Sequence, residues 1–195
     1  MIVADRIAEV AVLPGYRAPK DRPEPLDGLA WIVYHAAGGE VPGFGGIYDV
    51  VALARLHMEH PDWAKVTGRL PYPLVIPRGG GVEQGAPLRA QTPHAKSYNA
   101  KSIGVAILMT RTSGVSDEQY RTLEKLAVVL DSIKPGLRHV THSELGYPSA
   151  TDDPRKVVGG ALEDPPADFE VWRLRACVAD ARMRPRTANL YGLRW

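Results

Sequence analysis

The sequence predicts an α/β fold: a single domain with a mixed central β-sheet flanked by helices. Short, continuously apolar runs, typical of buried strands, occur at residues 29–34 and 103–109. Segments with the apolar spacing of amphipathic helices occur at residues 48–60 and 116–133. Strands that alternate with helices in this way are typical of an α/β domain with a mixed sheet.

The N-terminal third of the chain divides into three parts. Residues 1–26 are rich in proline and weakly patterned, so we expect an extended arm that packs on the domain or leads into it. The strand at residues 29–34 ends at His35, and after a glycine-rich loop the helix at residues 48–60 is closed by Pro61.

A β-hairpin is predicted next. Residues 74–76 and 82–84 are strand-like and flank the run Gly79-Gly80-Gly81. Pro73 and Pro77 border the first of these strands, and proline is largely confined to edge strands, so we expect this strand near an edge of the sheet. Residues 103–109, apolar almost throughout, are expected to form the central strand.

Two helices are expected in the C-terminal half. A capping box, Ser116-Asp117-Glu118-Gln119, opens the first, and Pro135-Gly136 ends it. The second is expected over residues 166–183. We therefore divide the chain into an N-terminal extension (1–26), a main domain (27–164) and a C-terminal helix with a tail (165–195) that pack on the domain.

Composition excludes several classes of protein. The chain has 195 residues and a formal net charge of +2, so nothing demands nucleic acid as a partner. Cys177 is the only cysteine, which rules out an intramolecular disulfide. No apolar run reaches the roughly 18–20 residues of a membrane span, and residues 1–6 lack the pattern of a secretory signal. We expect synthesis in a bacterial cytoplasm, no membrane span, and a monomer.

Three positions have the residue types of a zinc hydrolase site. Such a site needs three His, Asp, Glu or Cys ligands and one open position. His35 follows a buried strand, His142 follows another short extended run, and Asp152-Asp153 precede Pro154. Spacing alone leaves two readings open, because a lone histidine after a strand is often a hydrogen-bonded structural residue and an Asp pair before proline is often a turn.

A longer segment resembles a known family. The stretch Pro93-His94-Ala95-Lys96-Ser97-Tyr98-Asn99-Ala100-Lys101-Ser102-Ile103-Gly104-Val105 is similar to the most recognisable part of the N-acetylmuramoyl-L-alanine amidases, which include phage lysozyme-type amidases, cell-wall recycling amidases and peptidoglycan recognition proteins. Further matches, in the same order, are Ile32-Val33-Tyr34-His35, residues 57–63 and 70–76, and Thr141-His142-Ser143-Glu144-Leu145. The resemblance covers residues 29–157 and implies the amidase and peptidoglycan recognition protein fold.

The resemblance implies a zinc ion bound by His35, His142 and an aspartate. In the family the third ligand directly precedes a proline, which favours Asp153, whereas Asp152 fits the commonest spacing from the second histidine. We favour Asp153, since Pro148 also aligns if Tyr147 is a one-residue insertion.

The same resemblance gives Tyr72 and Thr151 catalytic roles. Tyr72 stands where the family tyrosine bonds the zinc water or the developing oxyanion, and Thr151 stands in a slot that usually holds Lys or Thr if Asp153 is the ligand. If Asp152 binds instead, the slot holds Ala150, and Arg155 or Lys156 would have to substitute. The general base is open between the zinc water with Tyr72 and Glu144.

His94 and Asn99 match positions that line the family's substrate groove. The alternatives are that Asn99 caps a turn and that His94 bonds only backbone. One departure from the family lies beside Tyr72, where Pro73 replaces a His or Asn.

The resemblance implies a hydrolase that cuts the amide bond between N-acetylmuramic acid and L-alanine in peptidoglycan, whose muropeptide stem is the expected partner. Without a signal peptide, the expected context is a phage endolysin or a particle-mounted hydrolase that reaches the wall after release, ahead of a recycling enzyme. The alternative from another class is a peptidoglycan-binding or structural module that has kept the fold and lost turnover.

Overall fold

The computed structural model describes residues 3–22, 28–41, 45–61, 64, 69–109, 113–145 and 169–183. The elements in chain order are β1 (Val3–Asp5), α1 (Ile7–Ala11), β2 (Lys20–Asp21), β3 (Trp31–Ala37), β4 (Gly39–Val41), β5 (Gly45–Ile47), α2 (Val50–Glu59), β6 (Leu74–Ile76), β7 (Val82–Gln84), β8 (Ala90–Gln91), η1 (Asn99–Lys101), β9 (Ser102–Leu108), α4 (Asp117–Ile133), β10 (Arg138–Thr141), η2 (Ser143–Leu145) and α5 (Val171–Met183). Within these residues, every helix is too short or too polar to cross a membrane.

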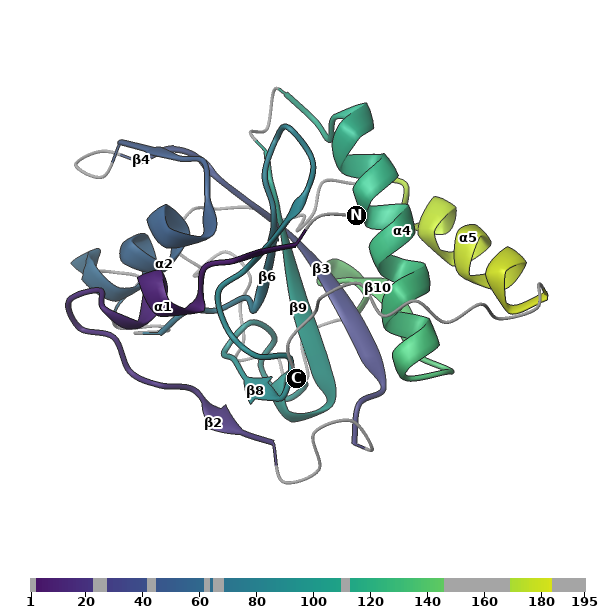
Figure 1. Ribbon diagram of the computed structural model, residues 1–195, viewed down its shortest axis with the longest axis horizontal. Helices are drawn as coiled ribbons and strands as arrows, with labels where there is room; N and C mark the ends of the chain where they lie inside the picture. Colours follow the sequence, from purple (N-terminus) through teal and green to yellow (C-terminus); the bar gives the residue numbers. More distant parts are fainter. Residues whose placement is uncertain are drawn as a thin grey trace.

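A mixed six-stranded sheet forms the centre of the molecule, in the order β1-β7-β6-β9-β3-β10 (Figure 1). The strands β6, β9, β3 and β10 are parallel to one another, β7 is antiparallel to β6, and β1 is parallel to β7. The longest pairing joins β3 to β9 from Trp31↔Ser102 to Ala37↔Leu108. The sequence therefore predicted the fold class and the central strand correctly.

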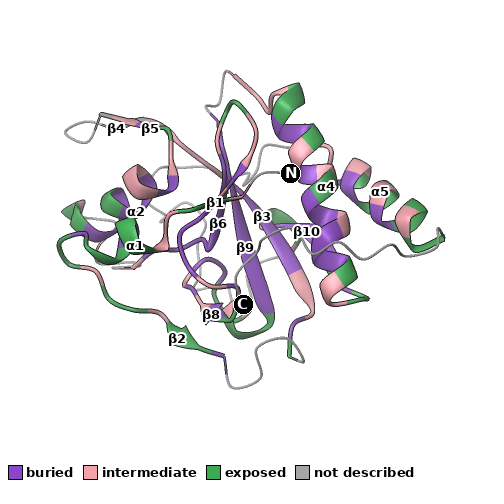
Figure 2. Ribbon diagram, in the orientation of Figure 1, coloured by how far each residue is buried: buried purple, intermediate pink, exposed green. Residues whose placement is uncertain are grey.

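Helices cover both faces of this sheet. Figure 1 shows α1 and α2 on one side and α4 and α5 on the other. Residues Ile32 and Tyr34 of β3 belong to the apolar cluster under α4 and α5. Figure 2 shows that the strands at the centre of the sheet are largely buried. Because side chains alternate along a strand, His35 points to the opposite face, where α2 packs. The sheet thus separates the apolar cluster under α4 and α5 from the face that carries His35, where a second apolar cluster includes residues of α1 and α2.

The predicted hairpin is present, but its first strand is not at an edge. Strand β6 lies between β7 and β9 in the sheet. Pro73 and Pro77 stand directly before and after the three-residue strand, so neither has to donate a hydrogen bond within it. The prolines therefore limit the length of β6 rather than its position, and the edge prediction was wrong.

The capping box begins α4 as the sequence predicts. The Ser116 hydroxyl accepts a hydrogen bond from the Gln119 backbone N–H, and the Gln119 side chain accepts one from the Ser116 N–H. The Gln119 amide also donates to the carbonyls of Ile76 and Leu108, which ties the start of α4 to β6 and β9. The last helix starts at Val171, later than expected, and Phe169 before it packs between Tyr34 and Tyr120.

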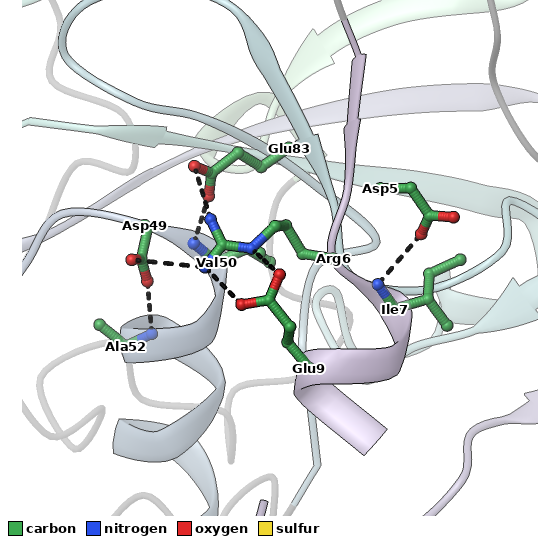
Figure 3. Close-up of polar contacts among 8 residues, drawn as sticks. All are labelled: Asp5, Arg6, Ile7, Glu9, Asp49, Val50, Ala52 and Glu83. Carbon is green, nitrogen blue, oxygen red and sulfur yellow. Dashed lines mark hydrogen bonds and ion pairs between the residues drawn. The ribbon is translucent and has the colours of Figure 1, made fainter. Parts of the chain in front are cut away.

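The N-terminal segment is part of the architecture. Strand β1 pairs in parallel with β7 as the outermost strand of the sheet. Figure 3 shows the Arg6 guanidinium among three carboxylates, those of Glu9, Asp49 and Glu83. Glu83 accepts the Val50 N–H and Asp49 accepts the Ala52 N–H, so this cluster also caps the start of α2. The segment therefore joins the sheet to α2.

Candidate metal centre

The first candidate ligand, His35, lies inside β3 rather than at its end, because the strand continues to Ala37. Its side chain is fully buried. Its partner on β9 is Ala106, whose small side chain leaves room on this face of the sheet. A rigid seven-residue strand therefore fixes the position of the imidazole.

The second candidate ligand, His142, directly follows β10. Its backbone N–H donates to the Tyr34 carbonyl, which extends the β3–β10 pairing by one residue. The His142 ring lies with its centroid 4.7 Å from that of His35. Two imidazoles that bind one zinc ion at about 2.0–2.1 Å have ring centres about 5 Å apart, so this separation suits a shared ion. His142 is only half-buried, so the site reaches solvent on its side.

Tyr72 joins the two histidines from a third part of the chain. It lies two residues before β6, and its ring centroid is 4.7 Å from that of His35. In the register of the sheet Leu74, the first residue of β6, is level with Tyr34 of β3 through Val105 of β9, so Tyr72 approaches His35 from the segment that leads into β6. The phenol is nearly buried, at 8% exposed.

His94 is buried behind His35. The Nε2 atom of His35 lies 3.1 Å from Nδ1 of His94, and Nε2 of His94 lies 3.1 Å from the Ser102 hydroxyl. The ring lies against Gly104 of β9, where an added Cβ would be 2.7 Å from the His94 Cγ. Both ring nitrogens of His94 are therefore hydrogen-bonded inside the protein.

Asn99 closes the turn that carries His94. Its amide oxygen accepts the backbone N–H groups of His94 and Ala95, at 2.9 and 2.7 Å. This is the turn-capping arrangement that the sequence left open as an alternative. A contact of Asn99 or His94 with substrate stays a prediction.

The imidazoles around the candidate ligands are neutral near pH 7. Burial lowers the pKa of His57 on α2 to about 3, and the neighbouring His35 acts in the same direction. Burial, and next His35, likewise lower the pKa of His94 well below its ordinary value. A cation placed between His35 and His142 therefore meets no protonated His57 or His94.

Glu144, one of the two options for a general base, is already engaged. Its carboxylate accepts the Thr141 backbone N–H and pairs with Arg175 at 2.6 Å. Burial raises the pKa of Glu144, but the hydrogen bonds from Arg175 and Thr141 outweigh burial and leave that pKa below its ordinary value. A carboxylate stabilised in this way is a weak proton acceptor, which favours Tyr72 with the water.

The predicted third ligand lies outside the described residues. Thr151, Asp152 and Asp153, and with them the catalytic role predicted for Thr151, belong to that part of the chain. Among the residues that the structure describes, no three His, Cys, Asp or Glu side chains are placed to hold a metal ion. The donor set of His35 and His142 fits zinc, and it needs an oxygen or sulfur ligand from elsewhere in the chain to be complete.

The structure adds residues to the site that sequence reasoning gave no role. Ser102 and Gly104 belong to the motif around His94, but the sequence assigned them no role of their own. In the structure both contact the His94 ring. Arg22 of the N-terminal segment is buried and donates to the backbone carbonyls of Leu88, Ala90, Asn99 and Ser102. No sequence signal marks Arg22, because its partners are backbone atoms.

Comparison with solved structures gives the same fold. LysC, an N-acetylmuramoyl-L-alanine amidase from Clostridium intestinale, superposes with a TM-score of 0.62 at 16% identity, over 92% of this chain and 98% of that one. The endolysin of a Thermus scotoductus bacteriophage gives 0.56 at 17% identity, over 73% and 86%. Drosophila peptidoglycan recognition protein SD gives 0.56 at 18% identity, over 74% and 85%.

The sequence itself matches a family model. No curated protein matches the chain in sequence. The model of N-acetylmuramoyl-L-alanine amidase matches residues 47–156, more than half of the chain. That range includes Tyr72, His94, His142 and both candidate aspartates, and it begins after His35. The chain therefore belongs to the N-acetylmuramoyl-L-alanine amidase family.

Proposed function

We propose that this protein is a zinc-dependent amidase that hydrolyses the bond between the lactyl group of N-acetylmuramic acid and L-alanine of the stem peptide. The observation that carries the proposal is the convergence of His35, His142 and Tyr72, whose ring centroids lie 4.7 Å apart for both pairs with His35. These residues come from three separate segments of the chain, and membership of the amidase family gives the reaction class.

Each residue has a distinct task in this proposal. His35 and His142 hold the ion as neutral imidazoles, and Asp153 completes the set, with Asp152 as the alternative. When bound, zinc supplies a Lewis acid for the scissile carbonyl and lowers the pKa of a water molecule toward neutrality. Tyr72 donates its hydroxyl hydrogen to the carbonyl oxygen as negative charge develops there. Thr151 supplies a second, uncharged donor if Asp153 is the ligand.

Product analysis tests the reaction. Defined muropeptides are incubated with the zinc-loaded protein, with and without a chelator, and the products are identified by mass spectrometry. We expect free stem peptides that begin with L-alanine, and no release in the presence of chelator. Cleavage of a glycosidic bond, or between two stem amino acids, contradicts the proposal.

A pair of histidine variants provides a matched control. His142→Ala removes a proposed ligand and is expected to abolish peptide release. His60→Ala changes a half-buried histidine at the C-terminal end of α2 and is expected to keep it. Zinc retained by the wild-type protein without any released peptide, together with sedimentation on insoluble peptidoglycan, identifies a binding module instead.

The fold matches to an endolysin and to peptidoglycan recognition proteins support peptidoglycan as the ligand or substrate. We extend the proposal to a phage-type endolysin or a particle-mounted hydrolase. Purified protein added to bacteria is expected to lyse cells whose outer barrier has been permeabilised. A protein that releases peptides from soluble muropeptides but leaves whole sacculi intact contradicts this role and points to recycling.

A further inference from the structure

A chain of hydrogen bonds runs from His35 into the interior. The His35 Nε2 lies 3.1 Å from the His94 Nδ1, the His94 Nε2 lies 3.1 Å from the Ser102 hydroxyl, and that hydroxyl donates to the Tyr98 carbonyl at 2.8 Å. His35 and Ser102 are fully buried, and His94 is 7% exposed. Water therefore does not compete for these groups.

The last link sets the direction of all the others. A hydroxyl has one hydrogen, and a carbonyl oxygen only accepts, so the Ser102 hydrogen points to Tyr98. The Ser102 oxygen must then accept from the His94 Nε2–H. A neutral imidazole carries one N–H, so the His94 Nδ1 is an acceptor and takes the Nε2–H of His35. His35 is thereby left with its unprotonated nitrogen at Nδ1, and a metal ion binds only an unprotonated ring nitrogen.

An arginine of the N-terminal segment holds the backbone on both sides of the turn that carries His94. The Arg22 guanidinium donates to the carbonyls of Leu88 and Ala90, both at 2.6 Å, and to those of Asn99 and Ser102. These four carbonyls lie before and after the turn that carries His94. Arg22 is 3% exposed, and the range matched by the family model does not include it.

We propose that His94 and Ser102 are positioning residues that fix the proton of His35 on Nε2, and that Arg22 holds the turn that carries them. The N-terminal segment then helps to position the residues of the metal centre. This inference rests on the proposed function only in taking His35 as a zinc ligand. It gives His94 a role beneath the ligand in place of a direct substrate contact.

Nuclear magnetic resonance on the metal-free, full-length protein tests the direction of the hydrogen bonds. With ¹⁵N-labelled histidine, two-bond proton–nitrogen spectra distinguish protonated from unprotonated ring nitrogens. We expect the His35 and His94 rings both to carry the proton on Nε2. A proton on Nδ1 of His35 overturns the proposal, whatever the enzyme assay gives.

Zinc affinity tests the consequence. His94→Leu removes the acceptor for His35 and is expected to weaken zinc binding roughly 10- to 100-fold, as loss of an outer-shell partner does elsewhere. His94→Gln keeps an amide oxygen that can accept the same hydrogen, and it is expected to recover most of the loss. Ser102→Ala is expected to weaken binding roughly 10-fold. Equal affinity in wild type, His94→Leu and Ser102→Ala contradicts the proposal.

Arg22 is tested against a matched arginine. Arg22→Lys keeps the charge but cannot reach four carbonyls, and it is expected to lower zinc affinity severalfold with a folded protein by circular dichroism. The control is Arg89→Lys. Arg89 directly precedes β8, and its guanidinium pairs with the exposed Asp21. The same loss in both variants overturns the role of Arg22.

The outcomes separate this inference from the proposed function. A wild-type protein that binds zinc with the expected ring protons, but releases no stem peptide, removes the amidase proposal and supports the positioning role. If wild type, His94→Leu and Ser102→Ala all release stem peptide equally well and bind zinc with the same affinity, the amidase proposal is supported and the positioning role is removed.

Discussion

At the scale of single residues, Tyr72 separates binding from catalysis. Tyr72→Phe keeps the ring beside His35 and removes only the hydroxyl. We expect kcat to fall roughly 100- to 1000-fold, as when one hydrogen-bond donor to a developing oxyanion is lost, while zinc content stays unchanged. Steady-state kinetics on a defined muropeptide and metal analysis measure the two effects.

The control for this prediction is a second buried tyrosine. The Tyr120 hydroxyl on α4 accepts the Glu170 N–H at 2.9 Å, on the other face of the sheet. Tyr120→Phe is expected to cost about 1 kcal/mol of stability and leave kcat unchanged. A Tyr72→Phe enzyme with wild-type kcat removes Tyr72 from the chemistry.

Gly104 shows how little space lies beneath His94. A Cβ there would approach the His94 Cγ to 2.7 Å and Nδ1 to 2.9 Å. Gly104→Ala is therefore expected to displace the ring and destabilise the protein by about 1–3 kcal/mol, the usual cost of overpacking. Gly79→Ala is the control, since an added Cβ there has no neighbour within 4 Å. Urea unfolding should separate the two variants, and equal stability contradicts the tight packing.

His139 on β10 makes stability depend on pH. Burial lowers its pKa from 6.5 to about 4, against the opposing effect of Asp131. Above pH 6.5 neither the folded nor the unfolded state holds the proton, so the full stability is present. As the pH falls from 6.5 toward 4, the unfolded state is protonated first and stability is lost, by about 2 kcal/mol near pH 5.

The test for this residue compares slopes. The free energy of unfolding is measured in urea at several pH values for wild type and for His139→Gln, whose side chain does not titrate. The variant is expected to lose less stability on acidification. An identical pH dependence in both proteins contradicts the assignment to His139.

At the scale of elements, an ion pair fastens α5 to α4. Arg182 donates to both carboxylate oxygens of Asp131, at 2.9 and 2.5 Å, and the Asp131 side chain is only 5% exposed. Removing the arginine leaves the carboxylate with the Gly136 backbone N–H as a hydrogen-bond donor. Arg182→Met is expected to destabilise the protein by about 2 kcal/mol.

An exposed pair on the same helix provides the comparison. Arg121 and Glu118 are 67% and 56% exposed at their side chains. Arg121→Met is expected to change stability by less than about 0.5 kcal/mol, because solvent screens such pairs. Thermal or urea unfolding of the two variants gives the answer, and a larger loss for Arg121→Met refutes this ranking.

Elements whose signals are local were predictable. The start of α4 follows from Ser116 and Gln119. The side chain of each accepts a hydrogen bond from the backbone N–H of the other, within four residues of sequence. The place of β6 in the sheet was not predictable. Pro73 and Pro77 indicate only where the strand ends, whereas its position in the sheet depends on its pairing with β7 and β9. Strand β1 was not predicted for the same reason, since it forms by pairing with residues 82–84.

At the scale of the whole molecule, metal binding and folding are coupled. A ligand that binds only the folded state at about 100 times its Kd stabilises that state by about 2.7 kcal/mol. For a domain of this size we expect zinc to raise Tm by about 5–10 °C. His142→Ala is expected to lose the shift and His60→Ala to keep it, measured by calorimetry with zinc and with chelator. A zinc shift of equal size in His142→Ala contradicts the candidate centre.

The sequence by itself determined the family and the α/β class, and it named His35, His142 and either Asp153 or Asp152 as candidate ligands. Those conclusions rest on side chains, and side chains are what a sequence records. The motif around His94 and the residues His35, His142 and Tyr72 could therefore be named from the sequence alone.

Only the tertiary structure decided how these residues are related in space. The segment that leads into β6 brings the Tyr72 ring to within 4.7 Å of the His35 ring, measured between centroids, and a ring nitrogen of His94 is hydrogen-bonded to the buried Ser102 hydroxyl. Arg22 contributes through backbone carbonyls, which every residue type possesses, so no pattern of letters marks its partners. Contacts between distant segments are set by packing and register, and that is the physical reason the fold had to reveal them.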